Sequence, residues 1–514
     1  MHLNSIECFY GPEVTTMDNQ YINENNVENI DEETSPPVSP ISQSLHSSIL
    51  SLIIFTVFEL ETPITELEIV GLFQHMLPLN IRLSSTMERN NKGVLRWKKV
   101  VTRVEDHLIV PTFPLGLARE TYDEYLREYL SKIGCVNFSE DKPLWELHLV
   151  KYPSLNGECS LIFKASHAIG DGYSLVSLFC NIFQRADHPS LPFTFPQMSF
   201  KKQGDGKRTV IGLGNKMLGF MRKCVNTISD LMESSLRATF LEDRRSAIRS
   251  EAWTNMKIEL FRPFDIYSVT LSLKRVKQVK TKLGATVNDV ITGLLSYIIH
   301  LYTLRKTMVD HNVGDGLTPD FINCGTYTKM TLLVMSNMRV FDGFTNIEDM
   351  IRAVAWGNRS RAMFAELPTF ISAEKVSPVD FIIKAKEIMD RKKNSMLFYF
   401  IDKVLNIAFR IKGQKGMDEM IYSSFRNTST SISSVIGPKE KIAICNQPVN
   451  SVYFFVSGIP QSLTFTSVSC MEQLKLVVKM EKGFIDSKLF GSCMDEAFDN
   501  IFQAAFEDNQ DKDD

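Results

Sequence analysis

The chain has 514 residues, enough for two domains with substantial cores, and its 44% hydrophobic and 23% charged residues are typical of a soluble globular protein. The net charge of −3 argues against a general nucleic-acid binder, so we expect no nucleic-acid partner. Nine cysteines, an odd number without a CxxC pair, indicate reduced thiols in a protein that faces the cytosol. The chain starts without the basic and apolar regions of a secretory signal, and no stretch reaches about 18 uninterrupted apolar residues, so an ordinary transmembrane helix is not expected.

The first part of the chain predicts a leader followed by a mixed domain. Residues 1–36 are rich in Asn, Asp, Glu and Thr and predict a disordered leader. An N-terminal domain is expected over residues 37–198. Apolar spacing there predicts strands at Ile49–Phe58, Leu95–Val101 and His107–Val110 and helices at Ile64–Leu77 and Glu120–Ile133.

A hairpin followed by a glycine-containing turn is the most informative stretch. An alternating strand ends at Val150 and pairs through Gly157 with an apolar strand at Cys159–Ala165. The turn that follows, residues 166–172 with the sequence SHAIGDG, leads into an apolar helix. The hairpin would hold His167 at one end of a sheet, and glycines let a backbone turn sharply and approach a ligand. A lone histidine at a strand end is more often structural, but this setting favours an imidazole that accepts a proton near neutral pH.

Residues 199–250 predict a crossover between two halves. Basic residues precede an apolar segment, Val210–Met221, which Lys216 interrupts. A crossover helix packed on the protein fits this pattern, and so does an amphipathic helix lying on an anionic membrane surface. A single-pass span fits least, because Lys216 would sit near its centre.

The second half, residues 251–510, again mixes strands and helices. Strands are expected at Tyr267–Leu273, Thr331–Val340, Ser431–Val435, Val452–Val456, Leu463–Ser469 and Leu474–Met480, and helices at Leu273–Leu283, from Thr286 to about Leu304, at Phe381–Ile411 and at Ser492–Phe506. Phe398, Ile401, Leu405 and Phe409 form a stripe that suits core packing or lipid contact. Without a regular βαβ repeat, this order predicts an α/β (α+β) fold, a two-layer sandwich used twice.

The turn SHAIGDG resembles the HHxxxDG motif of the wax ester synthase/diacylglycerol acyltransferase family. Pro143-Leu144-Trp145-Glu146 is similar to its PLWE element and Asn288-Asp289 to its ND element, and later blocks are similar at residues 356–358, 434–438 and 458–463. The resemblance extends over about residues 35–510 and points to the plant branch, the O-acyltransferase WSD proteins. It implies two chloramphenicol-acetyltransferase-like domains with an active-site tunnel between them.

The same resemblance implies an activity and its partners. An acyl group would pass from acyl-CoA, the co-substrate, to a long-chain fatty alcohol or to diacylglycerol, giving a wax ester or triacylglycerol. No metal and no other cofactor would be needed. The protein would work at a membrane surface on the cytosolic face of the endoplasmic reticulum, with the plasma membrane as a further location.

The resemblance also implies roles for residues. His167 would be the general base, and Asp171 would hold the turn through an ion pair. Gly172 could offer a backbone N–H to the oxyanion. Pro143, Leu144 and Trp145 are expected to shape the sheet and the tunnel wall. Asn288 and Asp289 are expected to cap a helix or to line the tunnel.

Two departures from the family pattern keep alternatives open. Ser166 replaces the first motif histidine, and Ser434 stands where many members have Asn. Ser166 motivates a second hypothesis, a lipid-binding paralogue that kept the tunnel and lost turnover. A third is a BAHD-type acyltransferase of small alcohols, whose DFGWG element is absent here, since Gly458-Ile459-Pro460 occupies that region.

Overall fold

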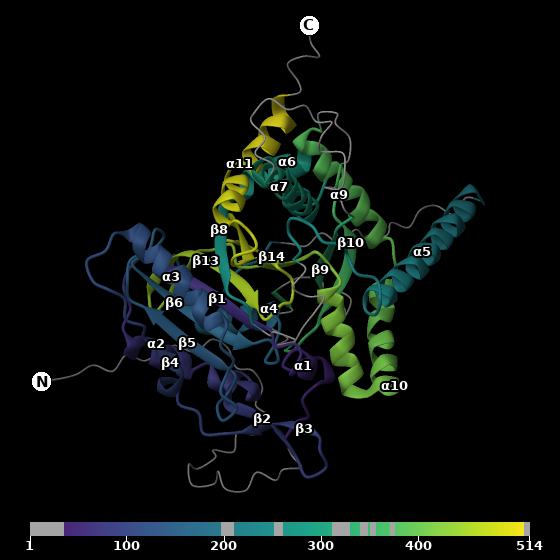
Figure 1. Ribbon diagram of the computed structural model, residues 1–514. Coiled ribbons are helices and arrows are strands. Elements are labelled where there is room, and N and C mark those ends of the chain that lie inside the picture. The colour runs from purple at the N-terminus through teal and green to yellow at the C-terminus, as the bar shows by residue number, and fades with distance from the viewer. Residues whose placement is uncertain are drawn as a thin grey trace, which may run out of the picture.

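The computed structural model describes residues 35–196, 210–250, 261–310, 329–339, 348–349, 356–370 and 376–507. Two large sheets form the centre of the molecule, and helices cover them (Figure 1). The expected mixed α/β fold is confirmed. Within the described residues, most expected elements are present with bounds shifted by a few residues. The predicted leader falls almost wholly outside the described residues.

The first sheet has seven strands and draws them from both halves of the chain. In spatial order they are β4 (Leu108–Ile109), β5 (Trp145–Val150), β6 (Cys159–Ser166), β1 (Ile53–Leu60), β13 (Gln447–Ser457), β12 (Ile442–Ile444) and β7 (Gln184–Arg185). Every residue of β1 and β6 is buried, which explains why both strands are mostly apolar. Since β12 and β13 complete this sheet, the two halves interlock, and the bounds 37–198 and 251–510 stay predictions.

The second sheet has six strands and carries a cover of helices. Its order is β10 (Ser360–Glu366), β9 (Thr331–Asn337), β11 (Thr430–Ile436), β14 (Leu463–Cys470), β15 (Gln473–Glu481) and β8 (Phe264–Ser272). Four helices gather beside it in Figure 1: α6 (Leu273–Lys282), α7 (Val287–Asp310), α9 (Pro378–Lys393) and α11 (Ser487–Glu507). A small hairpin of β2 (Ser85–Arg89) and β3 (Leu95–Lys99) stands apart.

The remaining helices lie around the first sheet and the boundary between the sheets. They are α1 (Pro40–Ser44), α2 (Glu66–Gln74), α3 (Arg119–Gly134), α4 (Gly172–Ile182), α5 (Val210–Arg237) and α10 (Leu397–Arg426). Among the described residues, one helical segment, Val287–Val309 of α7, is long and apolar enough to cross a membrane. Most of that segment is buried inside the protein, against α9 and α11, so it serves the core.

The single helix expected at Phe381–Ile411 is wrong. The structure has two helices, because α9 ends at Lys393 and α10 begins at Leu397. Their junction is fixed from outside, since the Thr227 hydroxyl accepts the backbone N–H of Met396 at 2.8 Å. The helix α10 then reverses at Gly413, whose φ of 66° and ψ of −167° are open to glycine and strained for other residues, so α10 is a helical hairpin (Figure 1). Helical periodicity does not reveal such a turn when the apolar spacing continues across it.

The packing of α7 on α9 depends on a glycine. A Cβ added at Gly293 would lie 2.6 Å from Cα and 2.8 Å from the backbone nitrogen of Ile382. We therefore expect Gly293→Ala to lower the free energy of unfolding by about 1–3 kcal/mol, measured by urea denaturation, because the backbones must separate.

Gly71 provides the matched control for this substitution. It also lies inside a helix, α2, and a Cβ there would meet nothing within 4 Å. Gly71→Ala should leave stability unchanged or raise it by up to about 1 kcal/mol through helix propensity. Equal effects at the two glycines would show that the close approach is not what matters.

Candidate active site

The backbone of three neighbouring segments fixes the position of His167. The turn leaves the end of β6, where Ser166 lies opposite Ile53 of β1. The N–H of His167 donates to Leu52 O at 2.8 Å, and the N–H of Ser166 donates to Leu144 O at 2.9 Å. In the fully described stretch from Cys159 to Asp171, His167 alone has a side chain that is not buried. The imidazole is therefore held rigidly at the edge of the sheet and faces a cavity.

Asn358 fixes the tautomer of that imidazole. The Asn358 Nδ2 group donates to the carbonyl oxygen of His167 at 2.8 Å and to the Ser42 hydroxyl at 3.1 Å. A carbonyl can only accept, so the amide nitrogen must face it and Oδ1 must face the ring. Asn358 Oδ1 lies 2.9 Å from His167 Nδ1, which must therefore carry the proton. The lone pair of the neutral ring then resides on Nε2.

The surroundings keep this ring neutral. Burial lowers the pKa of His167 below its ordinary value of 6.5, while the negative charge of Asp171 opposes that shift. At pH 7 the imidazole is therefore able to accept a proton on Nε2.

Asp171 is the polar centre of the turn. Its carboxylate forms a two-point ion pair with Arg339, at 2.9 and 3.0 Å, and both side chains are 2% exposed. It also caps α4 by accepting the N–H of Ser174 at 3.1 Å, and it accepts from Arg359 N at 3.0 Å and Ser360 Oγ at 3.1 Å. Burial raises the pKa of Asp171, but the charge of Arg339 and these hydrogen bonds outweigh it, so the net pKa is lowered. The Asp171 oxygens are occupied by these groups, and His167 Nδ1 is bonded to Asn358, so Asp171 is not the third member of a triad.

Close packing explains the two glycines of the turn. Neither Gly170 nor Gly172 has a positive φ. A Cβ at Gly170 would lie 2.7 Å from that of Ser174, and one at Gly172 would lie 2.9 Å from Cγ2 of Val435. Trp356 Nε1 donates to Ile169 O at 2.8 Å and closes the turn from outside. Gly170 thus makes room for Ser174 of α4, and Gly172 lets the turn fit against Val435 in the second half of the chain.

Ser166, which precedes His167, has a histidine as its neighbour. Its hydroxyl lies 3.1 Å from Nδ1 of His46 and accepts the N–H of Ala168 at 3.3 Å. The Ser166 side chain is buried, at 1% exposure, so it takes no part in lining the cavity.

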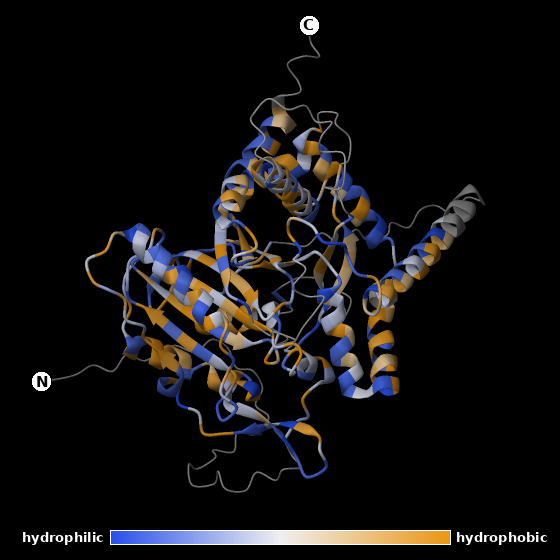
Figure 2. Cartoon of the chain, in the orientation of Figure 1, coloured by the Kyte–Doolittle hydropathy of each residue, from blue (hydrophilic) through white to orange (hydrophobic). Residues whose placement is uncertain are grey.

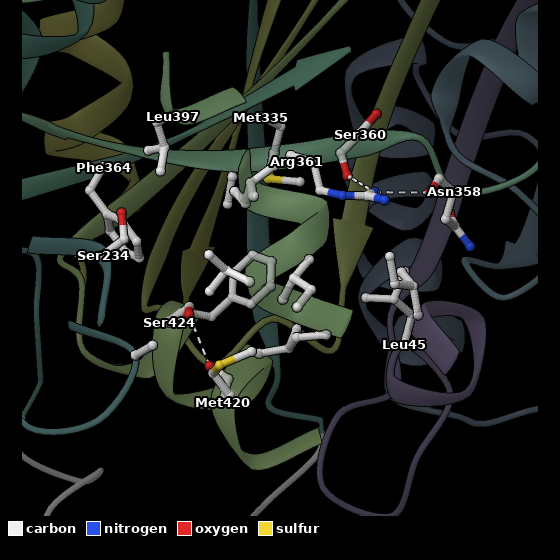
Figure 3. A pocket seen from close by; sticks show the side chains of 18 of the residues that line it. Leu45, Ser234, Met335, Asn358, Ser360, Arg361, Phe364, Leu397, Met420 and Ser424 are labelled. Carbon is white, nitrogen blue, oxygen red and sulfur yellow. Dashed lines mark hydrogen bonds between the residues drawn. The ribbon is translucent and has the colours of Figure 1, made fainter. Parts of the chain in front are cut away.

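A largely apolar pocket opens beside His167 and encloses about 1080 Å³, its open mouth included. Its walls come from α1, α5, α10, β9 and β10, so both halves of the chain contribute. In Figure 3, Asn358 and Leu45 lie at one end and Phe364 and Ser234 at the other. A second apolar pocket of about 620 Å³ lies across α4 and is lined in part by Gly172 and Val435. The first pocket suits an aliphatic chain that ends at His167.

Two family models match this chain. The wax ester synthase/diacylglycerol acyltransferase catalytic domain matches residues 116–291, and the WS/DGAT C-terminal domain matches residues 356–502. The chain belongs to the wax ester synthase/diacylglycerol acyltransferase family. The first match contains His167 and Asp171, and the second begins at Trp356, so the motif resemblance noted above is confirmed.

Named relatives of this wax ester synthase/diacylglycerol acyltransferase family protein come from a plant. Wax ester synthase/diacylglycerol acyltransferase 11 of Arabidopsis thaliana is 28% identical over 447 residues, which is 85% of this chain and 87% of that protein. Wax ester synthase/diacylglycerol acyltransferase 3 of the same organism is 28% identical over 480 residues, 92% of this chain and 94% of that protein.

Two solved structures share the fold. The wax ester synthase/diacylglycerol acyltransferase from Marinobacter aquaeolei VT8 superposes with a TM-score of 0.54 at 13% identity, over 91% of this chain and 99% of that one. The first condensation domain of the CDA synthetase gives a TM-score of 0.52 at 11% identity, over 88% and 90%. These likenesses bear out the expected pair of chloramphenicol-acetyltransferase-like units.

The PLWE residues of this family member belong to the sheet, and neither described apolar pocket includes them. Trp145 is fully buried and donates Nε1–H to Leu83 O at 2.8 Å, and its ring stacks on His107 at a centroid distance of 4.1 Å. Pro143 and Leu144 are also buried, next to it at the start of β5. These residues therefore lie in the first sheet and its approach, and their expected part in the tunnel wall stays a prediction.

Asp289 of the ND element caps the start of α7. Thr286 N donates to Asp289 Oδ2 at 2.8 Å, and Asp289 N donates to Thr286 Oγ1 at 3.2 Å, which closes a reciprocal cap at the start of α7. Asn288 is exposed, and neither residue lines either apolar pocket. Asp289 thus takes part in a cap, and the expected role of Asn288 stays a prediction. Ser434, which stands where many family members have Asn, accepts a hydrogen bond from Ser467 Oγ at 2.8 Å.

Sequence reasoning missed three partners of the turn. Arg339 falls within the expected strand Thr331–Val340 without a role, Asn358 falls within a family block, and His46 is not singled out. A signal existed for Arg339, because a buried Asp needs a cation. Nothing in the local sequence around Asn358 or His46 indicates that they contact the turn.

The ion pair should dominate the stability of the site. Asp171→Asn removes the carboxylate that pairs with the buried guanidinium of Arg339, so we expect it to lower the free energy of unfolding by about 3–5 kcal/mol in urea denaturation. Asp171→Asn combined with Arg339→Met should recover part of this loss.

The exposed pair Glu88–Lys98 is the control, since its atoms lie at a similar distance, 2.8 Å, but the side chains are 48% and 56% exposed. Glu88→Gln should cost no more than about 1 kcal/mol. A loss for Asp171→Asn as small as that would mean that the buried pair does not hold the turn.

Proposed function

We propose that this family member is an acyl-CoA-dependent O-acyltransferase that makes wax esters from long-chain fatty alcohols, triacylglycerol from diacylglycerol, or both, with His167 as general base. Family membership supports acyltransferase activity of the wax ester synthase/diacylglycerol acyltransferase type. The observation that carries the proposal is the neutral His167 ring, protonated on Nδ1 by its bond to Asn358, on the wall of an apolar pocket.

The proposed chemistry is one proton transfer coupled to acyl transfer. The alcohol hydroxyl gives its proton to His167 Nε2 as its oxygen attacks the thioester carbonyl. The new C–O bond forms, the C–S bond breaks, and the imidazolium returns the proton to the departing CoA sulfur. Acyl-CoA is the co-substrate in this scheme, and the scheme uses no metal and no other cofactor.

The charges around His167 suit both states of this cycle. A lowered pKa keeps the ring neutral before attack, and Asp171 and the Asn358 oxygen favour the imidazolium once it forms. General-base assistance contributes roughly 10²–10⁴ in rate, so positioning and oxyanion stabilisation must supply the rest. We keep the backbone N–H of Gly172, at the start of α4, as the proposed oxyanion donor, although Gly172 lines the second pocket and not the first.

Substrates of this kind are dissolved in membranes, and we propose the cytosolic face of the endoplasmic reticulum as the working location, with the plasma membrane as a further one. Seven cysteines in the described residues are free thiols, including the buried Cys159, Cys470 and Cys493. This is what a reducing compartment favours.

One observation favours a second candidate, a lipid-binding paralogue without turnover. Ser166 replaces a motif histidine and is buried against His46. Acyl-CoA binding with no ester formed at any alcohol chain length would select this candidate. The BAHD-type alternative loses its support, because both family models belong to the wax ester synthase/diacylglycerol acyltransferase family.

Acyl transfer should depend on His167. Purified protein given palmitoyl-CoA with hexadecanol or diacylglycerol should form ester, and His167→Gln should lower the rate by about 10²-fold or more, because the described lining of the pocket offers no other base for the hydroxyl proton. His75→Gln, at an exposed histidine, is the control and should retain full activity. Undiminished ester formation in His167→Gln would refute the mechanism.

The pH profile should report the state of His167. Because its pKa is lowered, the base stays neutral down to below pH 6.5, and kcat/KM should fall only under that value. Asn358→Asp places a carboxylate against Nδ1, favours the imidazolium and should move this acid limb to higher pH.

The matched comparison is Asn358→Ala, which removes the acceptor without adding charge. Asn358→Ala should lower kcat, and the acid limb of its pH profile should lie at lower pH than the acid limb of Asn358→Asp. An acid limb above pH 6.5 in the unmodified protein would contradict the assignment of this limb to His167. So would an acid limb that does not move in Asn358→Asp.

A further inference from the structure

Two helices beside the pocket expose apolar side chains in rows. On α5 the row contains Met221, Val225, Ile228, Met232 and Leu236, each between 45% and 64% exposed. On the first leg of α10 it contains Phe400, Val404, Ile407 and Ile411, each between 36% and 76% exposed. Spacings of three and four residues place each row on one side of its helix. We call these nine residues the α5–α10 surface.

This surface is unlike scattered apolar residues elsewhere on the protein. Single exposed leucines are ordinary, but contiguous rows on two packed helices mark a site of interaction. The two helices contact one another, and α5 projects from the body beside α10 in Figure 1. Figure 2 shows hydrophobic residues recurring along both helices. The chain adds Phe240, 84% exposed, just after α5.

The pocket of His167 lies against the same two helices and meets this surface at Val404. The inner sides of the same helices line it, with Leu231 and Ala238 from α5 and Ile401 and Leu405 from α10. Val404 belongs to both, since it lines the pocket and is 36% exposed. An aliphatic chain entering beside Val404 would pass from the α5–α10 surface to the pocket without crossing a polar wall.

The charges around the rows are cationic. Arg222, Lys403, Arg410 and Lys412 are exposed on these helices. The acidic residues among the described side chains of residues 219–237 and 397–412 are engaged within the protein. Asp230 and Glu233 contact Lys392 at 2.7 and 2.8 Å, and Asp402 contacts Arg361 at 2.6 Å.

We propose that the α5–α10 surface docks on an anionic lipid bilayer and that the pocket draws its apolar substrate laterally from that bilayer. Apolar rows flanked by exposed Lys and Arg fit the boundary between lipid headgroups and acyl chains. Exposed Lys and Arg beside apolar rows complement anionic headgroups and acyl chains together, which favours a bilayer over a protein partner. The identity of the substrate rests on the function proposed above, whereas the docking does not.

Vesicle flotation tests the docking directly. The full chain should float with phosphatidylcholine vesicles that contain about a third phosphatidylserine, and less well with phosphatidylcholine alone. The variant Ile407→Glu/Ile411→Glu should bind at least about tenfold more weakly, because two charges replace inserted apolar groups. Leu115→Glu, at an 85% exposed leucine far from both helices in the sequence, is the control and should bind as the unmodified protein does.

A second variant separates charge from insertion and guards against misfolding. Lys403→Gln/Arg410→Gln retains the apolar rows and should lose most of the preference for phosphatidylserine. Equal flotation of the unmodified protein and Ile407→Glu/Ile411→Glu would overturn the proposal. So would a stable dimer in solution that this variant dissociates, with no vesicle binding by the unmodified protein, since the surface would then cover a second copy.

Acyl transfer to two acceptors distinguishes this proposal from the proposed function. Ile407→Glu/Ile411→Glu should keep its rate on a short, water-soluble alcohol and lose at least about tenfold on hexadecanol held in vesicles. Vesicle binding without ester from any acceptor would refute the proposed function and leave the docking in place. Equal rates of the variant and the unmodified protein on vesicle-borne hexadecanol would refute the lateral path.

Discussion

The buried ion pair between Asp171 and Arg339 joins the two halves of the chain at the turn that carries His167. Its carboxylate comes from the first half, just before α4, and its guanidinium comes from the end of β9 in the second. Both are removed from water, so either one alone would be costly, and the turn is stable only when the halves meet. The same carboxylate binds the backbone N–H of Arg359, next to Asn358, and so fixes the residue that orients the imidazole.

The ion pair is therefore connected to the proposed base through a few short contacts. The ion pair positions the segment 356–360, Asn358 in that segment fixes the proton on His167 Nδ1, and the opposite ring nitrogen is left as a base. The apolar pocket next to it depends on the same assembly, because α1, β10 and α10 all line it. A base, its orientation and a place for an aliphatic chain thus all arise where the halves interlock.

Local sequence was enough to predict the elements and the position of His167. Its strand is mostly apolar, the turn contains two glycines, and the helix that follows is apolar. The partners of the turn were out of reach, because His167 and Asn358 are 191 residues apart and their contact is set by how the sheets meet. Sequence spacing also hid the transfer of β13 into the first sheet and the reversal of α10 at Gly413. Both features are set by tertiary packing, which the periodicity of apolar residues does not report.

The central claim is that Asn358 holds His167 as the neutral tautomer with its proton on Nδ1. Nitrogen NMR of the protein labelled at histidine, with His167 assigned through His167→Gln, tests it most directly. At pH 7 the account predicts one protonated nitrogen, Nδ1, and one unprotonated nitrogen, Nε2, for this ring. A ring protonated on Nε2 alone, or on both nitrogens, would contradict the account.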